Sequence, residues 1–181
     1  MHKLFCIIAF FCIVEQARAQ VSAYNFTIVT AKGKIKPLQS FGGKRLMVVI
    51  LPGSLTSVDW LYLQRIDSIA HAMTNNFTVI AVPSYEDGYY TDSGHTLLNG
   101  YASILDSNLV VISQPTFTHA SSGNQQDSFF NWLTHADLNT HFDHEVLGAG
   151  TMFFLSEQGE LYAVFGPEAK WSNRVLNHVS K

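Results

Sequence analysis

Three hydroxyl side chains lie where the sequence changes from a buried strand to a helix. The segment VVILPGSLTSVDW, residues 48–60, is an apolar run followed by a Pro-Gly turn, Ser54, Thr56 and Ser57. A helix N-terminus lowers the pKa of a thiol, so reactive cysteines are found at such junctions. This junction has no sulfur. Because no G-x-S-x-G pattern accompanies the hydroxyls, we predict that Thr56 or Ser57 caps the helix and is not a nucleophile.

A second candidate for chemistry is the histidine-rich segment THADLNTHFDHE, residues 134–145. Its potential metal ligands are His135, Asp137, His141, Asp143, His144 and Glu145. Imidazole and carboxylate groups suit zinc, copper or iron, and His141 and His144 at i, i+3 would share one side of a helix. The spacing matches no established metal motif. We therefore expect a solvated surface loop, with metal binding through His135, His141 and His144 as the alternative.

Four tyrosines surround a stretch rich in Gly and Asp between residues 84 and 101: Tyr85, Tyr89, Tyr90 and Tyr101. Tyrosine offers a large contact area with few torsions to freeze, which suits a binding face. The same side chains also suit packing of a long loop onto the body of the protein. The sequence leaves both interpretations open.

Two segments, Asn25-Phe26-Thr27 and Asn76-Phe77-Thr78, satisfy the N-glycosylation pattern, which matters only in a eukaryotic exported protein. Both lead into predicted strands. Chance matches to so short a pattern are common, so the pattern by itself assigns no function.

The elements that position these residues follow from apolar runs and turn residues. We expect a hairpin over 24–38 around Lys32-Gly33, a buried strand over 45–51, and a helix over 58–73 whose apolar face carries Leu61, Ile66, Ile69 and Met73. Further expected elements are strands at 77–82 and 109–112, a short helix near 97–105, an Asp127-capped helix through Phe130, Trp132 and Leu133, a hairpin over 151–166 around Gln158-Gly159, and a terminal helix over 168–179 with Trp171, Val175 and Val179 on one face. This order predicts an α/β sandwich with a mixed central sheet, and the thioredoxin-like fold is the compact arrangement that fits it.

The first nineteen residues are typical of a secretory signal peptide. His2 and Lys3 precede an apolar run over 4–14, which is too short for a permanent membrane helix, and the small-residue pattern Ala17-Arg18-Ala19 follows. We expect cleavage after Ala19, a single domain over 20–181, and a periplasmic or secreted location. Both cysteines, Cys6 and Cys12, lie in this leader, so the mature chain is expected to contain no thiol and no disulfide.

Composition excludes two classes of partner. The formal net charge is −3 and no run of Lys or Arg occurs, so a nucleic-acid footprint is absent. No second long hydrophobic segment follows the leader, so we expect no membrane span in the mature chain.

Four segments in order resemble the glutathione peroxidase family: SAYNFTIVTAKGK (22–34), QSFGGKRLMVVILPGS (39–54), VIAVPSYEDG (79–88) and FFLSEQGELYAVFGP (153–167). The resemblance covers nearly all of the expected mature chain. It implies a thioredoxin-like three-layer sandwich that has a mixed central sheet and opens with a β-hairpin.

The same resemblance shows where that family's catalytic groups belong. Its members reduce peroxide with a cysteine or selenocysteine supported by glutamine, tryptophan and asparagine. The matching positions here are Thr56, Glu86, Gly148 and Ala149, and all four depart from the pattern. A threonine hydroxyl is hardly ionised at neutral pH and has no sulfenic oxidation state, so the resemblance implies the fold without its thiol chemistry.

These observations predict an exported glutathione peroxidase homologue that lacks thiol peroxidase activity and uses no cofactor. It would act as a binding or scaffold protein for an unidentified protein or small molecule. The alternative is an oxidoreductase of that family, active in the response to oxidative stress, that works by a non-thiol or metal-assisted route through residues 135–145. The sequence leaves the oligomeric state open.

Overall fold

Strand β3 (Arg45–Leu51) forms the centre of the main sheet because its side chains are apolar on both faces. The computed structural model describes residues 21–73, 76–89, 95–120, 123 and 125–169. In it the strands lie in the order β5-β4-β3-β6-β7, with bounds β4 Phe77–Pro83, β5 Val110–Ile112, β6 Met152–Leu155 and β7 Leu161–Phe165. β3 pairs in parallel with β4 and antiparallel with β6, so the sheet is mixed, as predicted.

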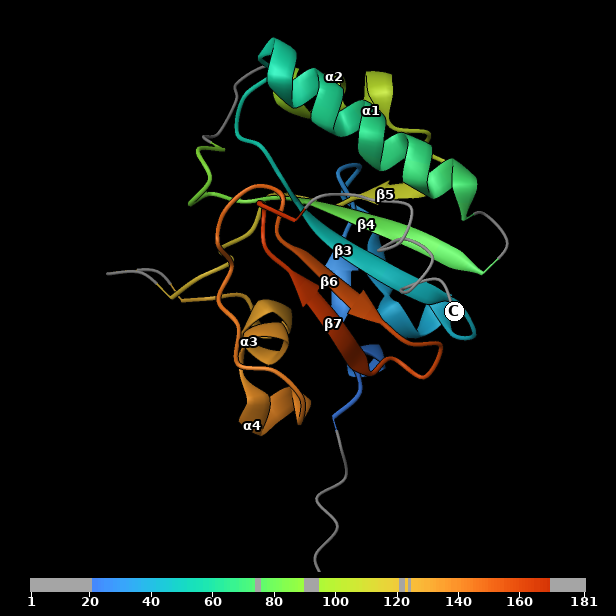
Figure 1. The fold of residues 1–181 in the computed structure, drawn as a ribbon, viewed down its shortest axis with the longest axis vertical. Helices are drawn as coiled ribbons and strands as arrows, with labels where there is room; N and C mark the ends of the chain where they lie inside the picture. The colour runs from blue at the N-terminus through green and yellow to red at the C-terminus, as the bar shows by residue number, and fades with distance from the viewer. Residues whose placement is uncertain (1–20, 74–75, 90–94, 121–122, 124, 170–181) are drawn as a thin grey trace, which may run out of the picture.

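Alternate residues of β3 divide the core into two halves. The helices are α1 (Ser57–Ala72), α2 (Thr96–Ile104), α3 (Ser128–Thr134) and α4 (Ala136–Asn139). Odd-numbered residues from Met47 to Leu51 belong to the half that contains α1 and α2, and even-numbered residues from Leu46 to Ile50 to the half that contains α3. Figure 1 shows α1 and α2 on one side of the sheet and α3 and α4 on the other. The described residues therefore form three layers.

The N-terminal hairpin lies on the α3 side of the sheet. Strands β1 (Thr27–Val29) and β2 (Ile35–Pro37) pair antiparallel, and Gly33 supplies the positive φ of +75° that the turn requires. The 3-10 turns η1 (Ala23–Asn25) and η2 (Leu38–Phe41) flank it and bury residues in the same half of the core. The predicted first hairpin is confirmed.

Most other predicted elements also agree with the structure to within a residue or two. The strands predicted at 77–82 and 109–112, the helix near 97–105 and the hairpin over 151–166 are present as β4, β5, α2 and the β6–β7 pair. Asp127 caps α3 by accepting the backbone N–H groups of Phe129 and Phe130 at 2.9 and 3.3 Å.

One predicted core position on α1 is wrong. Leu61 was expected on the apolar face, but its side chain is 67% exposed. The buried residues of α1 are Leu63, Ile66, Ile69 and Ala70. Apolar residues occur on more than one side of this helix, so periodicity alone does not select a face. Contact with the sheet selects the face centred on Leu63 and Ile66.

Three predictions fall outside the residues that the structure describes. They are the signal peptide over 1–19, the role of Tyr90, and the terminal helix beyond Ala169 with its apolar face of Trp171, Val175 and Val179. Within the described ranges, no helix has both the length and the apolar character needed to cross a membrane.

Candidate functional site

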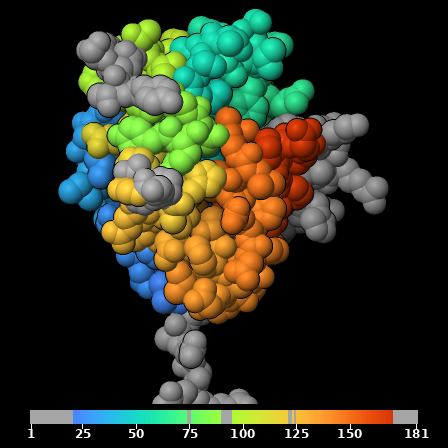
Figure 2. Space-filling model, turned by 90° about the vertical axis from the view of Figure 1, so that its left-hand side faces the viewer, coloured from blue at the N-terminus to red at the C-terminus, as the bar shows by residue number. Residues whose placement is uncertain are grey.

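Three loops meet at the C-terminal ends of β3 and β4. The first leads from Pro52 into α1, the second is the turn over 84–89, and the third is the segment 147–151 before β6. The third loop is tied to β3 by two backbone hydrogen bonds of 3.0 Å, from Ile50 N–H to the Thr151 carbonyl and from Gly150 N–H to the Ile50 carbonyl. Figure 2 looks onto this end of the molecule, where the start of α1, the turn after β4 and the loop before β6 adjoin.

Gly53 allows the first two loops to approach closely. A Cβ atom at this residue would lie 2.2 Å from the backbone oxygen of Asp87 and 2.5 Å from the carbonyl carbon of Gly88. No side chain fits in that space. The Pro-Gly turn that ends β3 therefore does more than end the strand: it brings the start of α1 against the turn after β4.

Thr56, which the sequence resemblance aligns with the family's chalcogen, is the N-cap of α1. Its hydroxyl donates to Oδ2 of Asp59 at 2.7 Å, and its backbone N–H donates to the same oxygen at 2.8 Å. In return, the Asp59 N–H donates to the Thr56 hydroxyl at 3.4 Å, which completes a capping box. The predicted role of Thr56 as a helix cap is confirmed.

The Asp59 carboxylate is the anion at this helix N-terminus. Ser54 adds a third hydrogen bond to Oδ2, from its hydroxyl at 2.8 Å. Partial burial favours the neutral carboxyl, but the hydrogen bonds from Thr56 and Ser54 outweigh it and hold the pKa of Asp59 below its ordinary value. The helix end that could stabilise a thiolate or bound anion thus already holds a charged group of the chain itself.

Glu86, which the sequence resemblance aligns with the family's glutamine, belongs to a hydrogen-bonded group that includes Ser84 and Thr118. Its Oε2 accepts from the Ser84 hydroxyl at 2.9 Å and from the backbone N–H of Thr118 at 3.0 Å. Burial alone would favour the neutral acid, yet these hydrogen bonds lower the pKa of Glu86. Ser84 and Thr118 are fully buried, and their hydroxyls also lie 2.9 Å apart. Glu86 therefore joins the second loop to the segment after β5.

Gly148 and Ala149, which the sequence resemblance aligns with the family's tryptophan and asparagine, lie beside Asp87. Oδ1 of Asp87 accepts the Ala149 N–H at 3.0 Å. A Cβ atom on Gly148 would lie 3.1 Å from the same oxygen, and Gly148 has a φ of +109°, which side chains rarely adopt. Any side chain at 148 would therefore be strained in this loop.

Asp87 itself is a feature that the sequence did not single out. Its Oδ2 is buried and has no hydrogen-bond partner. Burial raises the pKa of Asp87, and the hydrogen bond from the Ala149 N–H offsets only part of the effect. No sequence signal marks Asp87, because its burial arises from loops that are distant in sequence. Asp59 was also missed, although the T-x-x-D spacing from Thr56 resembles a capping-box pattern.

The described tyrosines of the 84–101 stretch mainly pack. Tyr101 is fully buried and donates its hydroxyl to the Pro52 carbonyl, and Tyr89 is buried in the same half of the core. Tyr85 is half-buried and packs its ring on Phe117, with centroids 4.7 Å apart. These contacts favour the packing interpretation over a binding face for Tyr85, Tyr89 and Tyr101.

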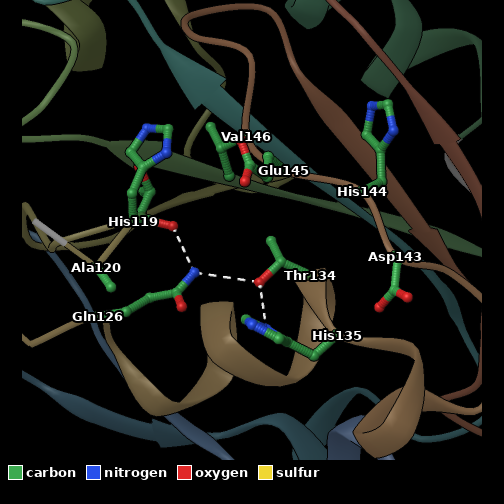
Figure 3. Close-up of a pocket in the computed structure, with 10 residues that line it drawn as sticks. His119, Ala120, Gln126, Thr134, His135, Asp143, His144, Glu145 and Val146 are labelled. Atoms are coloured by element: carbon green, nitrogen blue, oxygen red, sulfur yellow. Dashed lines mark hydrogen bonds between the residues drawn. The ribbon is translucent and has the colours of Figure 1, made fainter.

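The histidine-rich segment lines part of a pocket of about 560 Å³. Figure 3 shows His119 and His144 on opposite sides of this pocket and His135 at the end of α3. Nδ1 of His135 lies 2.8 Å from the Asn131 carbonyl oxygen and 3.0 Å from the Thr134 hydroxyl. Oδ1 of Asp143 accepts the Ala136 N–H at 2.6 Å. His135 and Asp143 thus make local hydrogen bonds, whereas Nε2 of His144 is buried without a partner, and these side chains do not converge.

The metal candidates are not assembled as a ligand cluster. Residues His141 and Asp143 are exposed, and the ring of His141 lies against Phe142, with centroids 6.3 Å apart. Across the part of the chain that the structure describes, no group of three or more His, Cys, Asp or Glu side chains has the arrangement to hold a metal ion. No observation therefore favours the metal-assisted alternative.

Comparison with known proteins shows the fold. No family model matches the sequence, and no curated protein matches it. Solved structures do match: Trgpx in its apo form has a TM-score of 0.64 at 11% identity, covering 88% of this chain and 93% of that one. T. cruzi GPX1 has a TM-score of 0.62 at 15% identity, covering 88% and 97%. MTB dsbF, in its mixed oxidized and reduced forms, has a TM-score of 0.55 at 10% identity, covering 89% and 96%.

The chain has the thioredoxin-like fold. Two of these neighbours are glutathione peroxidases, so the predicted three-layer arrangement with a mixed sheet and an N-terminal hairpin is confirmed. The thioredoxin-like fold supports redox chemistry in other chains, but chemistry depends on the side chains that a particular chain carries. In this chain the start of α1 carries Thr56 and Asp59.

Proposed function

We propose that this protein is an exported relative of the glutathione peroxidases that has no thiol peroxidase activity and acts by binding a partner. Its mature domain would span residues 20–181 after removal of the 1–19 leader. The fold of the solved neighbours and the four matching sequence segments support the relationship. The partner is a protein or small molecule that the sequence and the fold leave unidentified.

One observation carries the proposal: the Asp59 carboxylate occupies the N-terminus of α1. Peroxide reduction in this fold requires a chalcogen that is ionised near neutral pH and can be oxidised and recycled. Thr56 provides neither an ionised group nor an oxidisable atom, and its hydroxyl and N–H are both bonded to Asp59. The Thr56 and Ser54 donors at this helix end are therefore already bonded to a carboxylate of the chain itself.

The surrounding positions support the same conclusion. Glu86 has a lowered pKa and thus adds a second negative charge at this end of the sheet, which disfavours an anionic nucleophile. Gly148 offers no indole nitrogen, and its φ of +109° disfavours any side chain. Since Cys6 and Cys12 belong to the leader, the proposed mature chain has no other sulfur nucleophile.

The direct test measures hydrogen peroxide consumption by residues 20–181, with glutathione or a thioredoxin system as the reductant. We expect a rate equal to that of a heat-denatured sample, while an active glutathione peroxidase measured alongside provides the positive control. Turnover above the heat-denatured sample would refute the absence of activity.

The binding part needs its own measurement. The mature protein, immobilised through a C-terminal tag, is exposed to native extract or culture medium, and retained proteins and small molecules are identified by mass spectrometry. A matched column carries heat-denatured protein. We expect retention of a specific component at a stoichiometric level; equal recovery from both columns contradicts a binding role.

A further inference from the structure

The two N-glycosylation patterns place both asparagines at the surface of the folded chain. Asn25 is the last residue of η1 and is exposed, and Asn76 is exposed immediately before β4. Thr27 is exposed, whereas Thr78 is 8% exposed. An oligosaccharide on either asparagine would therefore project into solvent without displacing a buried side chain.

A chain of contacts brings the two asparagines to the same end of the molecule. The backbone N–H of Arg45 donates to the carbonyl of Asn76 at 2.8 Å, and Nε of Arg45 donates to Oε1 of Glu157 at 2.8 Å. On the other side, the hydroxyl of Tyr24, the residue before Asn25, donates to the carbonyl of Glu157 at 2.6 Å. Asn76 and the residue before Asn25 thus each contact one member of the Arg45–Glu157 ion pair, although 51 positions separate the two asparagines in sequence.

This end is opposite the loops of the candidate functional site. Arg45 begins β3 and pairs with Phe77 at the start of β4, whereas Leu51 and Pro83 end the two strands at the loops that hold Thr56 and Asp87. A seven-residue strand spans about 20 Å. Bulky groups on both asparagines would cover one end of the sheet and leave the opposite end open.

We propose that Asn25 and Asn76 both carry N-linked oligosaccharides, which cover the end of the sheet opposite the Thr56 loop. The inference rests on the exported state in the proposed function, taken as secretion from a eukaryotic cell, where this pattern is glycosylated. Each asparagine side-chain nitrogen would form a bond to the anomeric carbon of a sugar donated by a lipid-linked diphospho-oligosaccharide. The bond from that carbon to the diphosphate oxygen breaks, and the amide loses one proton. No electrons are transferred.

Thr78 is buried in the folded protein, and this is compatible with the proposal. The oligosaccharide is added as the chain enters the secretory compartment, before the strand is packed. The completed fold must then tolerate the product, and the exposed Asn76 side chain does so. Surface placement of both acceptors is the physical requirement that a short sequence pattern cannot test and the structure meets.

The test expresses the whole chain, residues 1–181, in insect cells and analyses protein recovered from the medium. Peptide-N-glycosidase F should reduce its mass by two oligosaccharides and convert two asparagines to aspartates. Asn25→Gln and Asn76→Gln should each lose one oligosaccharide, and the double variant both. Asn99→Gln, an exposed asparagine on α2 outside any such pattern, should keep both.

A second pair of variants changes the pattern at Thr27 and leaves Asn25 itself unchanged. Thr27→Ala should remove the oligosaccharide at Asn25 while leaving that asparagine in place, and Thr27→Ser should retain it. Secreted protein with an unmodified Asn25 or Asn76 would overturn the inference while leaving export intact. If the native leader gives no secreted protein, export itself is contradicted, and residues 20–181 behind the leader of a secreted protein then test the two asparagines separately.

Discussion

At the scale of single residues, the candidate site is defined by what surrounds Thr56. The chain has a hydroxyl where the sequence resemblance predicts a thiol or selenol, and the adjacent carboxylate of Asp59 lies at the helix N-terminus. Both features disfavour a reactive sulfur chemistry at this position. The first removes the reactive atom, and the second makes the place unfavourable for an ionised sulfur even if one were introduced.

The variant Thr56→Cys tests this electrostatic account. Beside ionised Asp59 we expect the introduced thiol to keep a pKa at or above the ordinary value of about 8.5, despite the helix N-terminus. In Thr56→Cys with Asp59→Asn the pKa should fall by about one unit. Absorbance of the thiolate at 240 nm across a pH titration measures both values. Identical titration curves for the two proteins would contradict a role for the Asp59 charge.

Asp87 gives the second prediction, because its folded-state pKa is raised by burial. The folded protein then binds a proton more tightly than the unfolded chain, so this residue lowers the free energy of unfolding as pH rises from about 4 through the folded-state pKa. Asp87→Asn removes this dependence while keeping an oxygen for the Ala149 N–H.

Urea denaturation at several pH values measures the effect. The free energy of unfolding of Asp87→Asn, relative to that of the native chain, should increase as pH rises through that window, because only the native chain loses stability there. The exposed Asp137→Asn is the matched control and should show a constant difference. A constant difference for Asp87→Asn as well would mean that the Asp87 carboxyl is not perturbed by burial.

At the scale of elements, glycines decide how closely the loops approach. Gly53 lies against the backbone of the β4 turn, whereas Gly88 in that turn has a positive φ of +90° but open space around it. Gly53 is required because a side chain would collide with the facing backbone, and Gly88 is required because of its positive φ. Substitutions at the two residues therefore measure steric exclusion and backbone strain separately.

Substitution by alanine should distinguish the two glycines. Gly88→Ala should cost about 1–2 kcal/mol, the strain of a left-handed alanine. Gly53→Ala should cost about 3 kcal/mol or more, because its Cβ meets backbone atoms that have no rotamer to change. Urea midpoints at constant m-value give both numbers. If both variants lose the same free energy of unfolding, the two loops move apart to accommodate the Cβ at residue 53 without a further loss of stability.

Helix α1 supplies a matched pair of leucines. Leu63 is fully buried between the helix and the sheet, and Leu61, two residues earlier, is 67% exposed. Leu63→Ala should lower the free energy of unfolding by about 2–5 kcal/mol. Leu61→Ala should change it by less than about 0.5 kcal/mol. Thermal or chemical denaturation measures both, and a large loss from Leu61→Ala would mean that another surface covers this residue.

At the scale of the whole molecule, stability comes from the two apolar faces of the sheet. Buried side chains from α1 and α2 cover one face, and those from α3 and the N-terminal segments cover the other. No disulfide is expected in the proposed mature chain, because Cys6 and Cys12 lie in the leader. A domain of this length buries enough apolar surface to fold without one.

The thermal midpoint of residues 20–181 should therefore be the same with and without a reductant such as dithiothreitol. The matched control is the full chain 1–181 recovered from the medium of the same host, which should behave identically if the leader is removed. If the thermal midpoint of the protein recovered from the full chain falls on reduction, that protein contains a disulfide between Cys6 and Cys12 or between chains, and hence has retained the leader.

The order of strands and helices could be read from the sequence because it depends on local chemistry. The continuous apolar run over 45–51 predicts a strand buried on both faces, and Gly33 and Gly159 mark the two hairpins. Asp127 marks the start of α3 in the same way. The missing chalcogen at Thr56 is equally a property of residue type, once the resemblance gives the position.

Only the tertiary structure decided which side chains share an environment. Leu61 and Leu63 have the same chemistry, and contact with the sheet alone buries the second. The carboxyl of Asp87 accepts the N–H of Ala149, about sixty residues later in the chain, and burial in the folded protein raises its pKa. Residue type sets what a group can do, whereas burial and charge depend on neighbours that the chain brings together only when it folds.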